Sequence, residues 1–206
     1  MSTRLSKTEQ LSALHAQIKA CRLCAEQGFE ITGPPIFSGN ADAQVMLIGQ
    51  APGATEVQHH RPFNFTSGTR LFKWLAQVGW SEEEFRANAY MCAMTRCYPG
   101  KHASGRGDRV PTLPEQALCA RWREAELALL DLKLIIPVGK LAISLYFDVR
   151  QPLTEIIGQV LIQDGKFIVP LPHPSGASTW YMQPANKPYL EKAIGHLRDI
   201  KEELNL

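Results

Sequence analysis

Four of the 5 cysteines in this chain of 206 residues are spaced so that they could reach one metal centre. Cys21 and Cys24 lie two residues apart, a spacing that lets both thiols bind the same metal. Cys97 and Cys119 flank a polar segment and could meet this pair if the N-terminal part of the chain docks beside that segment. Cys92 falls in an apolar stretch, and we interpret it as a core residue. The spacing leaves three interpretations open: separate buried thiols, a zinc site or an iron–sulfur cluster.

Two further groups of residues follow short apolar runs. Gly49-Gln50-Ala51-Pro52-Gly53-Ala54-Thr55-Glu56 comes after the run 45–48, and it lacks the signatures of phosphate-binding and dinucleotide-binding loops. Glu56 is the one acid between Asp42 and Glu82. His173 lies between two prolines, which stiffen the backbone around its imidazole. A carboxylate and an imidazole are groups that can stabilise opposite charges in a transition state.

Alternating helices and strands must position these residues. The pattern predicts α/β architecture: one domain over residues 1–206, with a central, mainly parallel four-stranded sheet between two layers of helices. The expected strands are 45–48, 88–94, 134–138 and 167–171. The expected helices are 6–20, a helix capped by Ser67 and ended by Gly79, 114–131, 140–147 and 187–204.

Three loops, 49–66, 97–112 and 172–187, follow the carboxyl ends of expected strands, where open α/β sheets bind ligands. A hydrophobic content of 45% suits one sizeable core, and a net charge of +2 excludes a strong whole-molecule field for nucleic acid. The N-terminus lacks the apolar region of a signal peptide, and no run is long enough to span a membrane. We therefore expect a cytoplasmic monomer with no membrane partner.

The chain resembles the family 4 uracil-DNA glycosylases from about Cys21 to its end. The resemblance is carried by the motifs Gly49–Glu56, Arg61-Pro62-Phe63, Ser67-Gly68 and Pro172-His173-Pro174-Ser175-Gly176, in that order. It implies a DNA glycosylase of base excision repair, which hydrolyses the N-glycosidic bond of uracil or a related deaminated base flipped out of DNA. Its four-cysteine pattern also implies a [4Fe–4S] cluster on Cys21, Cys24, Cys97 and Cys119, and so favours iron–sulfur over zinc.

The resemblance assigns catalytic roles to Glu56 and His173. His173 would donate a hydrogen bond to the leaving base, and Glu56 would orient water or stabilise the sugar cation. The family's first acid falls on Gln50, which cannot act as a base, so carboxylate chemistry in this loop passes to Glu56.

The resemblance also implies the contacts of the flipped base. Phe63 would stack on the base, and the backbone of Gln50 and Ala51 would meet its edge. Ala93 replaces the family asparagine that reads the pyrimidine, so discrimination of uracil by this route is lost.

DNA phosphates could be bound by basic residues of the loop after Cys97: Lys101, His102, Arg106 and Arg109. The segment 175–182 has the small and apolar residues of a wedge that could enter the space left by a flipped base. Two alternatives stay open beside a uracil-specific enzyme. One is a superfamily member that acts on another lesion or covalently through His173, and the other is a non-catalytic iron–sulfur protein that binds nucleic acid.

Overall fold

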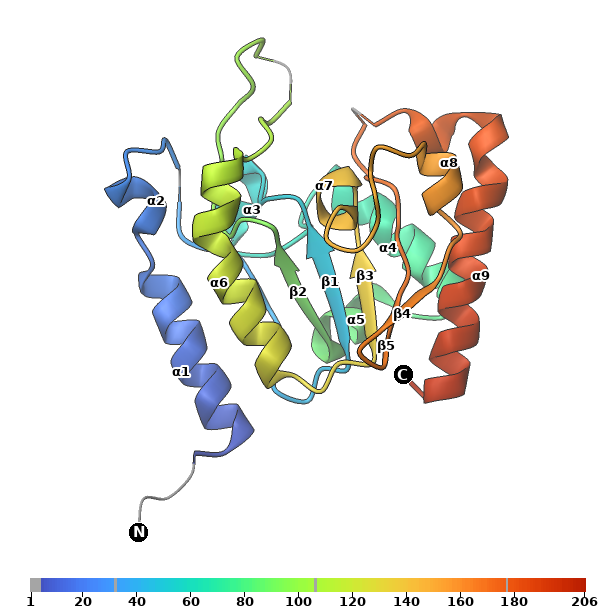
Figure 1. Cartoon of the computed structure of the whole chain (residues 1–206), viewed down its shortest axis with the longest axis horizontal. Helices are drawn as coiled ribbons and strands as arrows, with labels where there is room; N and C mark the ends of the chain where they lie inside the picture. Colours follow the sequence, from blue (N-terminus) through green and yellow to red (C-terminus); the bar gives the residue numbers. More distant parts are fainter. Residues whose placement is uncertain (1–4, 32, 106, 177) are drawn as a thin grey trace.

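A computed structural model describes residues 5–31, 33–105, 107–176 and 178–206 of the chain. Within these residues a five-stranded sheet has the order β2-β1-β3-β5-β4 (Figure 1). Its strands are β1 (Val45–Gly49), β2 (Ala89–Ala93), β3 (Leu134–Pro137), β4 (Leu161–Gln163) and β5 (Lys166–Ile168). Neighbouring pairs among β2, β1, β3 and β5 are parallel, and β4 is antiparallel at the edge. The predicted mainly parallel α/β sheet is confirmed, with one strand more than predicted.

The additional strand forms a hairpin with β5. Asp164 and Gly165 connect the two strands with φ values of 50° and 71°, the left-handed backbone of a tight two-residue hairpin turn. The final strand, expected over 167–171, is regular only to Ile168. Beyond it the chain stays extended, and Leu171 forms an isolated parallel bridge with Val138. This extension leads directly to His173 at the carboxyl edge of the sheet.

Helices cover both faces of the sheet, as predicted (Figure 1). The helices α4 (Thr66–Val78) and α9 (Lys187–Leu204) pack on one face, and α1 (Lys7–Ala20) and α6 (Leu113–Leu129) lie on the other. Successive side chains of β1 point to opposite faces of the sheet. Leu47 packs with α4 and α9, whereas Met46 and Ile48 pack in the core on the face covered by α1 and α6. Both layers are therefore fixed to the same short strands.

Two predicted helix starts differ from the structure. α4 begins at Thr66 after an extended Phe65, so the predicted cap at Ser67 is wrong. α6 begins at Leu113, because Thr112 accepts from the Glu115 amide and Glu115 reciprocates in a capping box. The helix expected over 140–147 forms but is shorter, as α7 (Lys140–Ile143). Several further short helices form that the sequence pattern did not predict: α2 (Leu23–Glu26), α3 (Ala54–His59), α5 (Glu82–Asn88), α8 (Leu153–Ile156), η1 (Trp180–Met182) and η2 (Pro184–Asn186).

No helix in the described part of the chain is long and apolar enough to cross a bilayer.

Candidate active site and cysteine pocket

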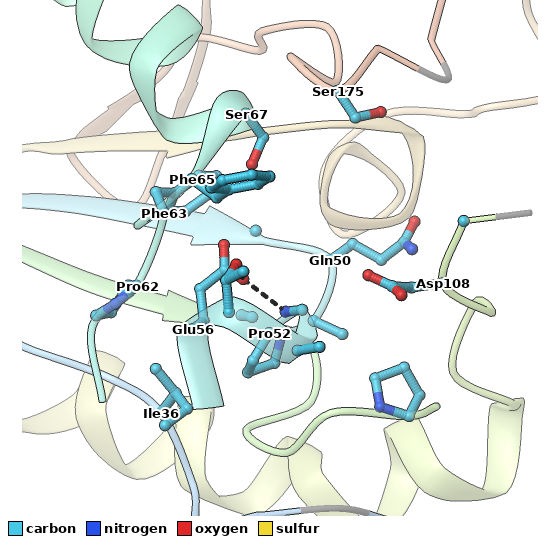
Figure 2. Close-up of a pocket in the computed structure, with 18 of the residues that line it drawn as sticks. Ile36, Gln50, Pro52, Glu56, Pro62, Phe63, Phe65, Ser67, Asp108 and Ser175 are labelled. Carbon is cyan, nitrogen blue, oxygen red and sulfur yellow. Dashed lines mark hydrogen bonds between the residues drawn. The ribbon is translucent and has the colours of Figure 1, made fainter. Parts of the chain in front are cut away.

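A pocket of about 580 Å³ opens at the carboxyl edge of the sheet, where the predicted loops meet (Figure 2). It is bordered by Gly49 at the end of β1, by Ala93 at the end of β2 and by His173 beyond β5. The structure gathers in it all the residues predicted for catalysis and base binding, namely Gln50, Ala51, Glu56, Phe63, Ala93 and His173. Their roles stay predictions, but their convergence on one pocket is a property of the fold.

The imidazole of His173 is held by close contacts with its neighbours. Gly139 leaves room for the ring: its φ is +84°, and a Cβ there would lie 2.7 Å from Cδ2 of His173. The Ser175 amide donates to Nδ1 of His173 over 3.2 Å. Burial lowers the pKa of His173 below its usual value, so the ring is neutral near pH 7. With Nδ1 accepting, the proton of the neutral ring lies on Nε2, which makes this atom a donor.

We expect His173 to be the Nε2–H tautomer in the native protein and to titrate below the ordinary histidine pKa of 6.5. Because the native pKa of His173 is depressed, the unfolded chain binds more protons at this residue than the native protein does once the pH falls below about 6.5. The contribution of His173 to the free energy of unfolding is therefore lost as the pH falls from about 6.5 through the native pKa. Two-bond ¹H–¹⁵N spectra recorded across pH 4–8 test both points, with His173→Gln to assign the signal. An Nδ1–H tautomer, or a pKa at or above the ordinary value, would contradict the arrangement.

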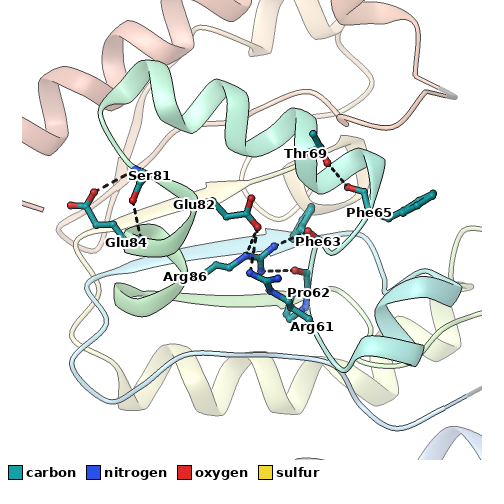
Figure 3. Close-up of polar contacts among 9 residues, drawn as sticks. All are labelled: Arg61, Pro62, Phe63, Phe65, Thr69, Ser81, Glu82, Glu84 and Arg86. Atoms are coloured by element: carbon teal, nitrogen blue, oxygen red, sulfur yellow. Dashed lines mark hydrogen bonds and ion pairs between the residues drawn. The ribbon is translucent and has the colours of Figure 1, made fainter.

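Phe63 lies over the end of β1 in a constrained conformation. Its φ is 50°, a left-handed value unusual for an aromatic residue. Arg86 fixes this turn by donating from Nη2 to the carbonyl of Phe63 and from Nη1 to that of Pro62, each over 2.8 Å (Figure 3). A Cβ at Gly68 would lie 1.8 Å from the Phe63 carbonyl oxygen, and one at Gly49 would lie 2.9 Å from the Phe63 ring. Arg86 is a positioning residue that no sequence pattern indicated.

Glu56 lies in the first turn of α3 and is 8% exposed. Its Oε2 accepts hydrogen bonds from the Gly53 amide and the Thr55 hydroxyl, each over 3.1 Å. The side chain therefore caps α3 as well as bordering the pocket. Asp108, which the sequence analysis did not single out, contributes a second carboxylate to the same pocket.

The residues predicted to bind phosphates differ in their surroundings. Lys101 is exposed and borders the pocket. Arg109 donates to both carboxylate oxygens of Glu115, over 2.6 and 2.7 Å, and to the Glu30 carbonyl over 3.1 Å. The hydrogen bond from Arg109 is the main reason why the pKa of Glu115 falls to about 2. Arg109 thus anchors the loop, its contact with DNA stays a prediction, and Arg106 lies outside the described residues.

The predicted wedge segment is only partly exposed. Tyr181 packs edge-on against Trp74, with ring centroids 5.3 Å apart, and Arg70 lies over the Tyr181 ring. Arg70 also donates to the Pro174 carbonyl, which ties the His173 loop to α4. Met182 is 58% exposed, and Ser175 and Ser178 of this segment line the active-site pocket.

The four cysteines predicted as cluster ligands line a second pocket, of about 360 Å³, which residues of α2 and α6 help to form. They are Cys21, Cys24, Cys97 and Cys119. Burial, and then the proximity of the other three thiols, raises the pKa of Cys97 to about 12. Cys92 is buried in β2 away from this pocket, in agreement with its predicted place in the core.

The side chains around the cysteine pocket offer hydrogen-bond donors that a sulfur-rich group could use. Among the described residues, no three His, Cys, Asp or Glu side chains are arranged to hold a metal ion. Three residues that line this pocket each carry a buried polar atom without a hydrogen-bond partner in the described part: Thr95 Oγ1, Arg96 Nε and Trp122 Nε1. The Arg96 amide also donates to Cys119 Sγ over 3.3 Å. Such donors suit the sulfurs of an iron–sulfur cluster, which commonly accept hydrogen bonds.

The fold and the pocket define an α/β enzyme whose site lies at the carboxyl edge of its sheet, beside a cluster of cysteines. The chain belongs to the uracil-DNA glycosylase superfamily, whose sequence profile matches residues 36–198. The predicted resemblance to this superfamily is confirmed.

Individual relatives agree with this assignment. A type-4 uracil-DNA glycosylase of Thermotoga maritima is 26% identical over 172 residues, covering 82% of this chain and 84% of the relative. One of Saccharolobus solfataricus is 25% identical over 209 aligned positions, covering 96% and 88%. A type-5 uracil-DNA glycosylase of Thermus thermophilus is 33% identical over 154 residues, covering 62% and 67%. The chain is thus similar to members of both types.

Proposed function

We propose that this protein is a DNA glycosylase of base excision repair, which hydrolyses the N-glycosidic bond of uracil or a related deaminated base. The observation that carries the proposal is the convergence of an aromatic ring, an imidazole donor and carboxylates on one pocket. Its volume of about 580 Å³ falls in the usual range for small-molecule sites, so a flipped nucleoside can enter it.

Different residues of the pocket contact the base and the sugar. The base stacks on Phe63, whose ring is held over β1, while the backbone of Gln50 and Ala51 meets the base edge. As the glycosidic bond breaks, Nε2 of His173 donates to the base oxygen on which negative charge develops. The carboxylate of Glu56 stabilises the positive charge that forms on the sugar.

Ala93 stands where the family has an asparagine that reads the pyrimidine, so the base must be selected in another way here. The methyl side chain of Ala93 makes no hydrogen bond, and its carbonyl oxygen accepts from the buried guanidinium of Arg96. Ala93 therefore has no side-chain group that could read a pyrimidine edge as an asparagine amide does. Selection therefore falls to Phe63, to the backbone beside Gln50 and to the size of the pocket, which admits related deaminated bases.

A [4Fe–4S] cluster on the four pocket cysteines is part of the proposal. The buried donor atoms Thr95 Oγ1, Arg96 Nε and Trp122 Nε1 support it, because none of these three atoms has a hydrogen-bond partner in the described part of the chain. When bound, the cluster supplies cross-linking between α2, the end of β2 and α6. DNA is the expected partner, with Lys101 beside the pocket mouth, and the cytoplasmic location and monomeric state stay predictions.

The proposal is tested with the iron-containing protein and oligonucleotides, single- and double-stranded, that carry one uracil, hypoxanthine or xanthine. We expect free base and an alkali-labile abasic site from the uracil strand, and no release from a matched strand with thymine. Binding of these oligonucleotides without release of any base would favour the non-catalytic alternative. A covalent adduct of His173 with the DNA would favour the covalent one.

A further inference from the structure

The loop after Cys97 folds back on itself and brings an acid to the pocket. Lys101 and Asp108 form an antiparallel bridge. The Arg109 amide donates to the Gly100 carbonyl over 3.0 Å, and the His102 amide to the Gly107 carbonyl over 3.1 Å. This hairpin-like path returns the chain to the pocket wall at Asp108.

The Asp108 carboxylate has one fixed oxygen and one that faces the pocket wall. Oδ1 accepts from the hydroxyl of the buried Tyr98 over 2.9 Å. Oδ2 accepts from no donor among the described residues, and it would lie 3.1 Å from a Cβ at Gly53. Glu56 Oε2 would lie 2.8 Å from that same Cβ. Two carboxylates therefore border the backbone of Gly53.

Hydrolysis needs a group that takes a proton from water, and the pocket offers few. The side-chain amide of Gln50 is too weak a base for this task. Figure 2 shows that this amide extends toward the same part of the pocket as Asp108. Glu56 Oε2 accepts from the Gly53 amide and the Thr55 hydroxyl, which holds this carboxylate in the cap of α3 and leaves Oε1 without a donor among the described residues. Asp108 Oδ2 is the open carboxylate oxygen on a side chain that no helix cap holds, on the same side of the pocket as Gln50.

We propose that Asp108 is the general base that activates the hydrolytic water, while Glu56 stabilises the sugar cation. This inference rests on the proposed function and deepens it. Two carboxylates in unlike surroundings commonly take unlike roles in one site. The Gln50 amide can hold the water beside Asp108 through its oxygen or its NH₂ group.

The step balances with water as the only co-reactant. The water oxygen gives an electron pair to the anomeric carbon, and the bonding pair of the C–N bond leaves with the base. The water proton passes to Oδ2 of Asp108, and His173 stabilises the departing base. Asp108 then releases its proton to solvent and the base takes one up, which leaves an abasic sugar with a new hydroxyl group.

Single-turnover excision by Asp108→Asn tests the proposal. We expect the rate to fall by about 10²-fold or more, the usual contribution of a general base, with unchanged affinity for an abasic-site duplex. Asp199→Asn is the matched control: it removes the same charge from an exposed site on α9 outside the pocket, and should leave the rate unchanged. Tyr98→Phe removes the hydrogen bond that orients Oδ1, so a smaller loss is expected.

Chemical rescue separates a base from a structural residue. Formate added to Asp108→Ala should restore part of the rate in proportion to its concentration, because a small carboxylate can occupy the vacated space, whereas a collapsed loop would not respond. Excision by Asp108→Asn at the parent rate, or a slow Asp108→Ala that formate does not accelerate, would overturn the role of Asp108 and leave the proposed function standing. A parent protein that releases no base would overturn both.

Discussion

Replacing His173 by alanine is expected to slow base excision by about 10²–10³-fold, the usual effect of removing one preorganised donor from a developing anion. The neutral ring is held with its Nε2 proton available, since the Ser175 amide occupies Nδ1. The leaving base, which is the hydrogen-bond partner of His173, develops negative charge only as the glycosidic bond breaks. Ground-state binding should therefore change little, and single-turnover rates beside affinity for an abasic-site duplex measure the two effects separately.

His196→Ala is the matched control for this variant, because His196 lies on α9 outside the pocket. It should excise at the parent rate. His173→Gln keeps a hydrogen-bond donor in nearly the same place and should recover part of the loss. Parent-like excision by His173→Ala would show that the leaving base is stabilised by another group, whatever the motif suggests.

We expect the parent protein to hold about four irons per chain, and we expect replacing Cys119 by serine to remove most of them. Cys119 lies on α6, and its Sγ accepts a hydrogen bond from the Arg96 amide. The substitution therefore removes one thiol of the cysteine pocket together with the acceptor of this hydrogen bond. The brown colour and the broad absorption near 400 nm should fade with the iron. The midpoint of thermal unfolding should fall as well, because metal binding contributes to folding.

Cys92→Ser controls for the removal of a thiol, since Cys92 is buried outside the cysteine pocket. It should keep its iron even if the strand loses stability. Iron retained in Cys119→Ser, or lost in Cys92→Ser, would show that the four ligands are wrongly assigned. Zinc without iron in the parent protein would exclude the cluster itself.

The architecture was predictable where apolar periodicity was strong. Val45–Gly49 and Leu134–Pro137 are short buried runs closed by glycine, and both are strands near the predicted bounds. The Leu161–Gln163 strand was missed because it is brief and half exposed at the sheet edge, although the Asp164-Gly165 dipeptide carries the signal of a hairpin turn. The exact start of a helix depends on single hydrogen bonds made by its capping residue, as at Thr112, and apolar periodicity does not report these bonds. Predicted helix ends are therefore less accurate than predicted helices.

The site was predictable only as far as motifs reach. The motifs placed Glu56, Phe63 and His173 in loops that the fold does bring together. Asp108 escaped notice because a polar, glycine-rich segment has no periodicity that says which side chain turns inward. Arg86 escaped for a related reason: its function is to donate to two carbonyls distant in sequence, and such contacts exist only once α5 has packed.

The loop that carries Asp108 lies between two of the predicted cluster ligands, Cys97 and Cys119. A cluster on these thiols would close residues 98–118 into a ring, and the entropy of closing a ring grows only with the logarithm of its length. Insertions at the exposed tip would then cost little stability, while the anchored ends would keep Tyr98 and Arg109 in register with the pocket wall. The cluster would thus allow this loop to vary in length and sequence through evolution without displacing the chemistry it supports.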